Sequence, residues 1–201
     1  MHINFMDMGL ANATYQPIYT LGPSGTSSEF ASRYFCEKMK EIYIHSRNTI
    51  NLNETYEEAR DNIKKHDGLL VVANAYQRIN DFYMDSSLKL LATFVVDTPL
   101  YGIATNKPLP NRGLTIASHP APIPLIDELL PRDLNVDRII ETNSTSEAAN
   151  AVINNEADIA LTTEIAADLH NLSFISNVRP ISMLWSVFAS GISKFETKEA
   201  I

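Results

Sequence analysis

Short apolar segments alternate along this chain with amphipathic segments that begin at a hydroxyl side chain. The segment GLLVVANA (68–75) is continuously apolar, as is typical of a strand buried in a parallel sheet. Three amphipathic segments open with Ser or Thr followed three residues later by Glu, which is the capping-box pattern of a helix start. These pairs are Thr26 with Glu29, Thr55 with Glu58, and Ser144 with Glu147. Further strands are predicted at 16–22, 88–96, 100–105, 113–118, 136–141, 157–163, 172–176 and 182–191. The alternation predicts an α/β fold.

The alternating elements fall into two sets. We expect residues 1–16 to form an N-terminal arm and residues 17–201 to form one two-lobed domain. The first lobe is predicted to comprise about 17–100 plus 179–201, and the second about 101–178, so that the last strand returns to the first lobe. Two lobes joined by two crossovers leave a cleft of the kind that commonly holds a small ligand.

Composition excludes several classes of protein. The 201 residues carry a formal net charge of -8, which argues against a protein that tracks nucleic-acid phosphates. The single cysteine, Cys36, allows no intramolecular disulfide and fits a reducing compartment. The N-terminus lacks the pattern of a signal peptide, and no window approaches the roughly 18 apolar residues that a membrane span needs. We therefore expect a cytoplasmic protein with a loose N-terminal arm and no nucleic-acid or membrane partner.

Hydroxyl side chains follow three of the predicted strands, at 26–28, 118–120 and 144–146. Ligands of open α/β sheets bind at the carboxyl ends of strands, where free N–H groups and the helix dipole favour anions. Ser and Thr are also preferred at helix N-termini when no ligand is bound. Two interpretations remain open here: plain helix capping, or a site for a small carboxylate or phosphate.

The order of these segments resembles the prephenate dehydratase catalytic domain. GPSGTSSEFAS resembles the GPxGTxSxxAA motif that opens that family, SHPAPIPLI its S-H-P segment, and STSEAANAV its S-T-x-A-A helix start. The resemblance runs from about Tyr19 to Phe188. It implies a two-lobed fold like that of type II periplasmic binding proteins, with prephenate bound in the cleft.

The sequence departs from that family at several polar positions. Dehydratases carry a Thr-Arg-Phe motif whose Thr is thought to help expel the ring hydroxyl, and the corresponding stretch here is Ser186-Val187-Phe188. We also expect no C-terminal regulatory domain, because the chain ends soon after this stretch. Other polar positions of the family are replaced at Ala75, Tyr76, Leu125 and Asn143.

A narrower resemblance fits these departures. The segments FYMDSSLKLL, DTPLYGIAT and SMLWSVF are similar to the prephenate decarboxylases of specialised metabolism, of the type that acts in bacilysin and aeruginosin biosynthesis. This resemblance implies a carboxy-lyase that removes the ring carboxylate of prephenate, keeps the ring hydroxyl and yields a dihydro-4-hydroxyphenylpyruvate. It also implies a homodimer that uses no cofactor and no metal.

The resemblance and the strand ends together suggest where the substrate binds. The expected substrate-binding residues are Thr26, Ser27, Tyr101, Ser118, Leu125, Asn143, Ser144, Thr145, Val187 and Phe188. The candidate catalytic residues are His119, Ser186 and Tyr76. His119 either donates a proton or only orients its turn through a backbone hydrogen bond, and a concerted route through the substrate's own hydroxyl would need no donor. Arg78 and Lys107 either add charge to the cleft or are solvated surface cations. The other histidines, His2, His45, His66 and His170, show no metal-ligand spacing.

Two other functions stay open at this stage. An ordinary prephenate dehydratase would release phenylpyruvate, which is aromatic. A binding module of the periplasmic-binding-protein type would bind a small carboxylate and release no CO2.

Overall fold

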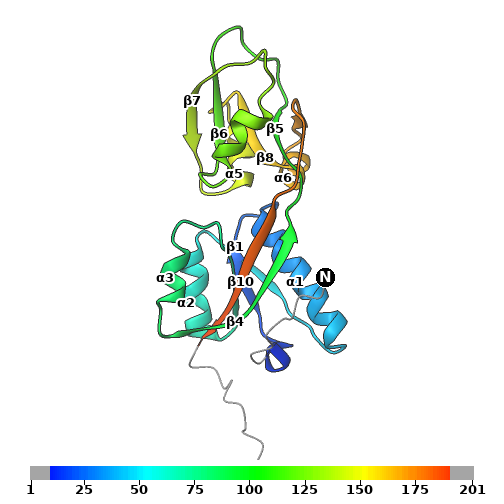
Figure 1. Cartoon of the computed structure of the whole chain (residues 1–201), viewed down its shortest axis with the longest axis vertical. Coiled ribbons are helices and arrows are strands. Elements are labelled where there is room, and N and C mark those ends of the chain that lie inside the picture. The colour runs from blue at the N-terminus through cyan, green and yellow to red at the C-terminus, as the bar shows by residue number, and fades with distance from the viewer. Residues whose placement is uncertain (1–9, 191–201) are drawn as a thin grey trace, which may run out of the picture. The chain divides into compact units, whose positions relative to one another are not determined.

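The computed structural model describes residues 10–190, which divide into two units (Figure 1). Within the described residues, unit 1 comprises 10–21, 31–96 and 183–190, and unit 2 comprises Gly22–Phe30 and Asp97–Ser182. The prediction from the sequence places Gly22–Phe30 in the first lobe, whereas in the structure this segment packs with unit 2. Each unit is described by itself below.

Unit 1 is built on a five-stranded sheet with the strand order β2-β1-β3-β10-β4. Its strands are β1 (Ile18–Leu21), β2 (Ile50–Asn53), β3 (Leu69–Ala73), β4 (Leu88–Asp97) and β10 (Ser182–Ser190). Strands β2, β1 and β3 run parallel, and β10 pairs antiparallel with β3. The continuous apolar run predicted as a buried strand is β3, of which Leu69 to Val72 are fully buried.

Helices cover both faces of this sheet (Figure 1). They are η1 (Leu10–Ala13), α1 (Ser27–Ile42), α2 (Tyr56–His66) and α3 (Ile79–Tyr83). The apolar stripe of α1, which includes Phe35 and Met39, packs with Trp185 on one face. On the other face an aromatic cluster joins Tyr56 of α2, Phe82 of α3 and Phe188 of β10.

Unit 2 repeats this plan with the strand order β7-β6-β8-β5-β9. Its strands are β5 (Tyr101–Thr105), β6 (Leu114–Ser118), β7 (Val136–Glu141), β8 (Ile159–Thr163) and β9 (Ser173–Phe174). Strands β7, β6 and β8 run parallel, and β5 pairs antiparallel with β8. Each unit therefore has three parallel strands in the order second-first-third, followed by one antiparallel strand.

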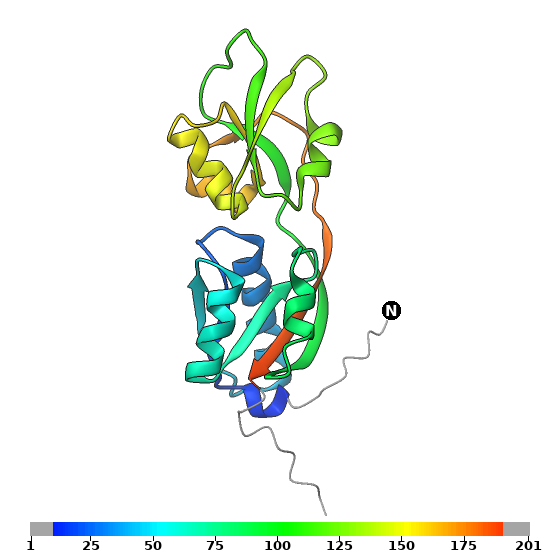
Figure 2. The same ribbon diagram turned by 90° about the vertical axis from the view of Figure 1, so that its left-hand side faces the viewer.

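The helices of unit 2 lie on opposite faces of its sheet (Figure 2). They are η2 (Ile123–Leu125), α4 (Ile126–Leu129), α5 (Thr145–Ile153) and α6 (Glu164–Leu169). Helices α5 and α6 pack on a core made almost wholly of alanine, including Ala148, Ala149 and Ala166. The α4 face has larger side chains, among them Leu125 and Leu129.

Two further parts of the chain differ from the sequence prediction. The strand β2 was not predicted, because its residues INLN are mostly polar and exposed and carry no buried pattern. The predicted arm is ordered in part: Leu10 and Ala13 of η1 are buried in the core of unit 1, so residues 10–13 are not loose. The rest of that arm, residues 1–9, and the predicted polar tail after residue 190 lie outside the described residues.

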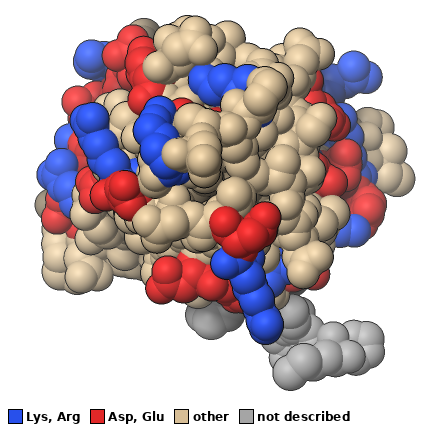
Figure 3. Space-filling view, turned by 90° about the horizontal axis from the view of Figure 1, so that it is seen from above, with Lys and Arg blue, Asp and Glu red and all other residues tan. Residues whose placement is uncertain are grey.

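The surface shows mixed charge. On the face drawn in Figure 3, acidic and basic side chains are interspersed without a broad patch of one sign. None of the helices between residues 10 and 190 is long and apolar enough to cross a bilayer.

Candidate active site

In unit 2, predicted site residues gather at the carboxyl ends of the parallel strands. Ser118 ends β6 and Thr163 ends β8, while Tyr101 begins β5 directly opposite Thr163. The backbone N–H of Thr142, after β7, donates to the carbonyl of Ser118 at 3.0 Å. We call this region, with the starts of α1 and α5, the unit 2 edge.

The α1 start is capped by Thr26 and is held at the unit 2 edge by the hydroxyls of Ser27, Tyr101 and Thr163. Thr26 Oγ1 accepts the N–H of Glu29 at 3.2 Å, which confirms the predicted cap. The Ser27 and Tyr101 hydroxyls lie 2.9 Å apart, and Thr163 Oγ1 donates to the carbonyl of Gly25 at 3.1 Å. Thr26, Ser27 and Tyr101 are therefore brought together from positions far apart in the sequence.

A buried carboxylate completes this turn. Glu29 is almost fully buried, and its Oε2 accepts the N–H of Gly25 at 2.8 Å and the Ser24 hydroxyl at 2.7 Å. Gly25 has a φ of 88°, a conformation that residues with a Cβ rarely adopt. A Cβ there would also lie 3.3 Å from the Cα of Ala166, so both backbone shape and space favour glycine.

Tyr101 is a buried phenol. Burial raises its pKa, and the hydrogen bond with Ser27 offsets this only in part. Tyr101 therefore stays neutral at physiological pH and offers a hydroxyl rather than a charge.

The α5 start shows the same capping geometry. Ser144 Oγ accepts the N–H of Glu147 at 3.0 Å, and the Glu147 carboxylate accepts the N–H of Asn143 at 2.9 Å. Thr145 is buried, and its carbonyl accepts the Thr162 hydroxyl at 2.7 Å. Of these predicted residues, Asn143 alone is exposed. The predicted cap is confirmed, and anion binding by the same helix start is left as a proposal.

His119 follows β6 and is partly buried. Its Nδ1 accepts the N–H of Ala121 at 3.1 Å, so the neutral ring carries its proton on Nε2. Burial lowers its pKa, and the nearby carboxylate of Glu141 only opposes this shift. The Ser118 hydroxyl donates to the carbonyl of His119 at 2.8 Å. At neutral pH this histidine is a hydrogen-bond donor at Nε2 rather than a cationic acid.

Leu125, a predicted substrate contact, lies at the end of η2 in the apolar core of unit 2. It is 7% exposed and packs in the same cluster as Tyr101 and Ile126. Leu125 therefore packs in the core beside Tyr101 of the unit 2 edge.

In unit 1, Ser186 lies in a closed ring of hydrogen bonds with Asn74 and Tyr83. Ser186 Oγ donates to Asn74 Oδ1 at 2.8 Å, and the Tyr83 hydroxyl lies 2.6 Å from Ser186 Oγ. Asn74 Nδ2 donates to the Tyr83 hydroxyl at 3.0 Å. We call these three residues the unit 1 ring. Ser186 itself is fully buried.

Strand alternation separates the three residues of the Ser186-Val187-Phe188 stretch. Ser186 and Phe188 point to the face covered by α2 and α3, where Phe188 packs edge-on against Tyr83 at 5.2 Å. Val187 points to the opposite face and lies in the core beneath α1. Val187 and Phe188 are both at most 1% exposed, so they belong to the core of unit 1.

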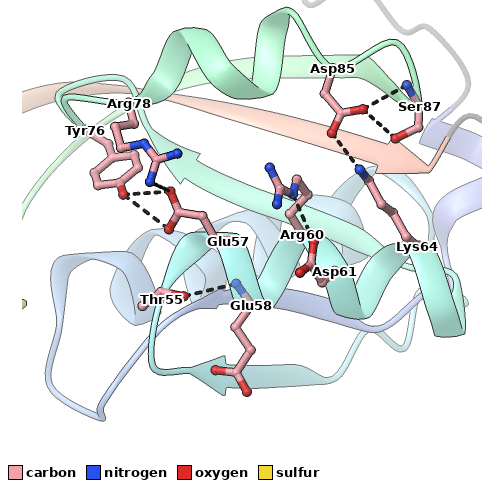
Figure 4. Close-up of polar contacts among 10 residues, drawn as sticks. All are labelled: Thr55, Glu57, Glu58, Arg60, Asp61, Lys64, Tyr76, Arg78, Asp85 and Ser87. Carbon is pink, nitrogen blue, oxygen red and sulfur yellow. Dashed lines mark hydrogen bonds and ion pairs between the residues drawn. The ribbon is translucent and has the colours of Figure 1, made fainter.

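Tyr76, the third candidate proton donor, is held by a carboxylate (Figure 4). Its hydroxyl donates to Glu57 Oε1 at 3.0 Å. Burial and this hydrogen bond raise the pKa of Tyr76 to about 12. Arg78 Nη1 pairs with the same carboxylate at 3.2 Å. Tyr76 is therefore a weak acid whose proton already has an acceptor.

The two cations considered from the sequence both have partners in the structure. Besides Glu57, Arg78 pairs with Asp81 at 2.8 Å, so two carboxylates flank it. Lys107 Nζ donates to the carbonyl of Val152 and to Asn155 Oδ1, both at 3.2 Å.

The remaining histidines are scattered. His45 and His66 are exposed, and His170 Nε2 lies 3.3 Å from the hydroxyl of Ser146. His2 lies outside the described residues. In residues 10–190 no cluster of His, Cys, Asp or Glu side chains has the composition of a metal site.

Sequence reasoning missed Asn74, Tyr83 and Thr163. Asn74 and Tyr83 join Ser186 only through contacts across more than 100 positions, which no local pattern reveals. Thr163 did carry a signal, because it stands at a strand end directly before a helix, and it caps α6 by accepting the N–H of Ala166.

Known proteins resemble this chain in sequence. A prephenate decarboxylase of Planktothrix agardhii is 38% identical over 177 residues, which cover 84% of this chain and 85% of that protein. The chain belongs to the prephenate decarboxylase family. A second relative, the prephenate decarboxylase of Bacillus subtilis (strain 168), is 35% identical over 87% of this chain and 86% of its own length. No protein-family model matches the chain. The resemblance predicted from the sequence segments is thus confirmed at family level.

Solved structures share the fold at low sequence identity. A prephenate dehydratase of Arthrobacter aurescens, in complex with L-Phe, matches with a TM-score of 0.57 and 15% identity, over 87% of this chain and 60% of that chain. An ABC transporter periplasmic substrate-binding protein of Coxiella burnetii matches with a TM-score of 0.55 and 12% identity, over 91% and 87%. The predicted α/β fold, like that of periplasmic binding proteins and prephenate dehydratases, is confirmed.

Proposed function

We propose that this protein decarboxylates prephenate without aromatising it, and that it serves the biosynthesis of a specialised metabolite. The observation that carries this proposal is the 38% identity to a prephenate decarboxylase over most of both chains. The substitution of Ser186-Val187-Phe188 for the dehydratase Thr-Arg-Phe motif supports it, because the arginine is replaced by an apolar side chain in the core.

The proposed reaction breaks the bond between the ring and its carboxylate. The electron pair of that bond enters the ring diene, CO2 leaves, and a ring carbon takes up a proton. The ring hydroxyl stays in place, so the product is a dihydro-4-hydroxyphenylpyruvate. A dehydratase would instead release the hydroxyl as water and form an aromatic ring.

The unit 2 edge is our proposed site for the pyruvyl carboxylate. Two helix starts lie there, each capped by a buried hydroxyl, at Thr26 and Ser144. The N–H groups of the first helical turn and the helix dipole favour an anion at such a position. Ser27 and Thr145 are the first residues of these helices.

We further propose that His119 binds the substrate through Nε2–H rather than acting as a cationic acid. The accepting role of Nδ1 and the lowered pKa both support the neutral ring. Tyr76 and Ser186 are then orienting groups, since each donates its proton to a neighbouring oxygen. The ring-carbon proton would come from the substrate hydroxyl or from water.

The decisive experiment is incubation of the purified protein with prephenate. Release of CO2 with a non-aromatic keto acid, identified by NMR and mass spectrometry, is the expected result. Phenylpyruvate would instead make the protein a dehydratase. Binding of prephenate without CO2 release would make it a binding module.

The carboxylate site has a matched pair of variants. Ser144→Ala removes a buried cap in unit 2, whereas Thr55→Ala removes the equivalent exposed cap of α2 in unit 1. A hydrogen bond to a charged group contributes about 1.5–3 kcal/mol, so Ser144→Ala should lower kcat/KM by about 10- to 100-fold. Thr55→Ala should leave kcat/KM near the wild-type value. Equal losses in both variants would refute the assignment of Ser144 to the site.

A further inference from the structure

The unit 1 ring has a fixed direction of hydrogen bonding. Asn74 Oδ1 is a carbonyl oxygen and can only accept, so Ser186 must donate its single hydroxyl proton to it. Ser186 Oγ then accepts from Tyr83, and the Tyr83 oxygen accepts from Asn74 Nδ2. Each hydroxyl proton in the ring is thus engaged by another member of the ring.

One donor is left over. The Asn74 carboxamide has two N–H groups, and the ring uses only one of them. The side of the ring formed by Asn74 and Tyr83 is accessible: Tyr83 is 37% exposed and Asn74 is partly exposed, whereas Ser186 is 0% exposed. A ligand that approaches this corner of unit 1 meets the carboxamide and not the serine.

The ring is held rigidly from three elements. The backbone N–H of Asn74, directly after β3, donates to the carbonyl of Leu184 in β10 at 3.0 Å. Tyr83, at the end of α3, packs edge-on against Phe188 of β10. Asn74 therefore stands at the carboxyl end of a parallel strand, where ligands of such sheets bind, and its side chain cannot turn without breaking the ring.

We propose that Asn74 donates its free N–H to the ring hydroxyl of the substrate, with Tyr83 and Ser186 as positioning residues; this rests on the proposed function. A carboxamide N–H donates a hydrogen bond but does not transfer its proton at neutral pH. The site thus holds the hydroxyl without helping it to leave. The Ser186 hydroxyl, which belongs to the same ring, donates its hydrogen bond to Asn74 Oδ1 and not to the substrate.

The test compares two inhibitors that differ in one group: cyclohexadienyl pyruvates with and without the 4-hydroxyl. Wild-type enzyme should bind the hydroxylated compound about three- to tenfold more tightly, as one neutral hydrogen bond provides. In Asn74→Ala the ratio of the two inhibition constants should fall to about one. Tyr83→Phe breaks the ring without removing the carboxamide, so the ratio should fall part of the way.

The control is Tyr34→Phe, which removes a phenolic hydroxyl from α1 of the same unit and should leave the ratio unchanged. If Asn74→Ala fails to fold, the milder Tyr83→Phe still decides the outcome. A wild-type ratio in the folded Asn74 or Tyr83 variants, or an equal weakening of both inhibitors, would overturn the proposal. Failure of wild-type enzyme to turn over prephenate would instead refute the proposed function.

Discussion

The two units use the same βαβαβ plan but fill it with different chemistry. In unit 1, polar side chains at the strand ends bind one another, in the unit 1 ring and in the Tyr76–Glu57 pair. In unit 2, hydroxyls at the strand ends mostly bind backbone groups, as Ser144 and Thr163 do. The packing beneath differs as well: an aromatic cluster supports unit 1, and alanine supports α5 and α6 in unit 2.

This difference has a physical consequence. Hydroxyls that bind the backbone fix helix starts and leave the first N–H groups directed outward, which suits an anion. Side chains that bind one another consume their own donors and leave few for a ligand. Unit 2 is therefore the better candidate for binding charge, and unit 1 for binding a neutral group.

The largest expected effect is on the aromatic support of unit 1. Phe82 is 1% exposed and contacts the rings of Tyr56 and Phe188. Phe82→Ala should destabilise the protein by about 3–5 kcal/mol, because the rigid rings around it cannot close the cavity. Urea denaturation measures the change. A loss below about 1 kcal/mol would mean that the cluster collapses easily and does not hold the unit 1 ring.

Unit 2 should be sensitive to the opposite change. Ala149 on α5 is fully buried among other alanines, so the helix lies close to the sheet. Ala149→Leu adds volume that this packing cannot accept and should cost about 1–3 kcal/mol. The matched variant is Ile153→Leu on the same helix, which is 39% exposed and should change the urea midpoint little. Equal midpoints in the two variants would contradict the comparison between the units.

The same contrast explains what the sequence could predict. A cap joins a hydroxyl to an N–H three residues away, so Thr26, Thr55 and Ser144 were correctly predicted from local spacing. In the unit 1 ring, Ser186 lies more than 100 positions from Asn74 and Tyr83 in the sequence. Asn74 and Tyr83 could therefore not be predicted from local spacing.

Burial was harder to predict than secondary structure. Val187 was predicted as a site residue with Ser186, although alternate residues of a strand face opposite sides of the sheet. The strand β2 was missed because an exposed edge strand has little apolar pattern.

The two equivalent caps offer a smaller effect on stability. Ser144→Ala in α5 should cost about 1 kcal/mol, since Ser144 is buried and the N–H of Glu147 loses its acceptor. Thr55→Ala in α2 should cost less, about 0.5 kcal/mol, because Thr55 is exposed and water can replace its oxygen. Urea denaturation at neutral pH measures both changes in the free energy of unfolding. The reverse order would show that exposure does not govern the strength of these caps.

The smallest expected effect is the pH dependence of stability that Tyr76 gives to unit 1. The pKa of Tyr76 is raised to about 12 from 10.0, first by burial and then by its hydrogen bond to Glu57. The folded state therefore keeps a proton that the unfolded chain loses near pH 10. The stabilisation is fully present below pH 10 and is lost as pH rises toward 12.

Tyr76→Phe removes this pH dependence. Between pH 9 and 11 the free energy of unfolding, measured by urea denaturation, should therefore fall less in this variant than in the wild type, by roughly a few tenths of a kcal/mol after solvent screening. Cys36 and Tyr101 also have raised pKa values, and the difference between the two proteins cancels their contribution. Parallel curves would show that the Glu57 contact does not hold the Tyr76 proton, and side-chain pairing in unit 1 would then be weaker than the geometry indicates.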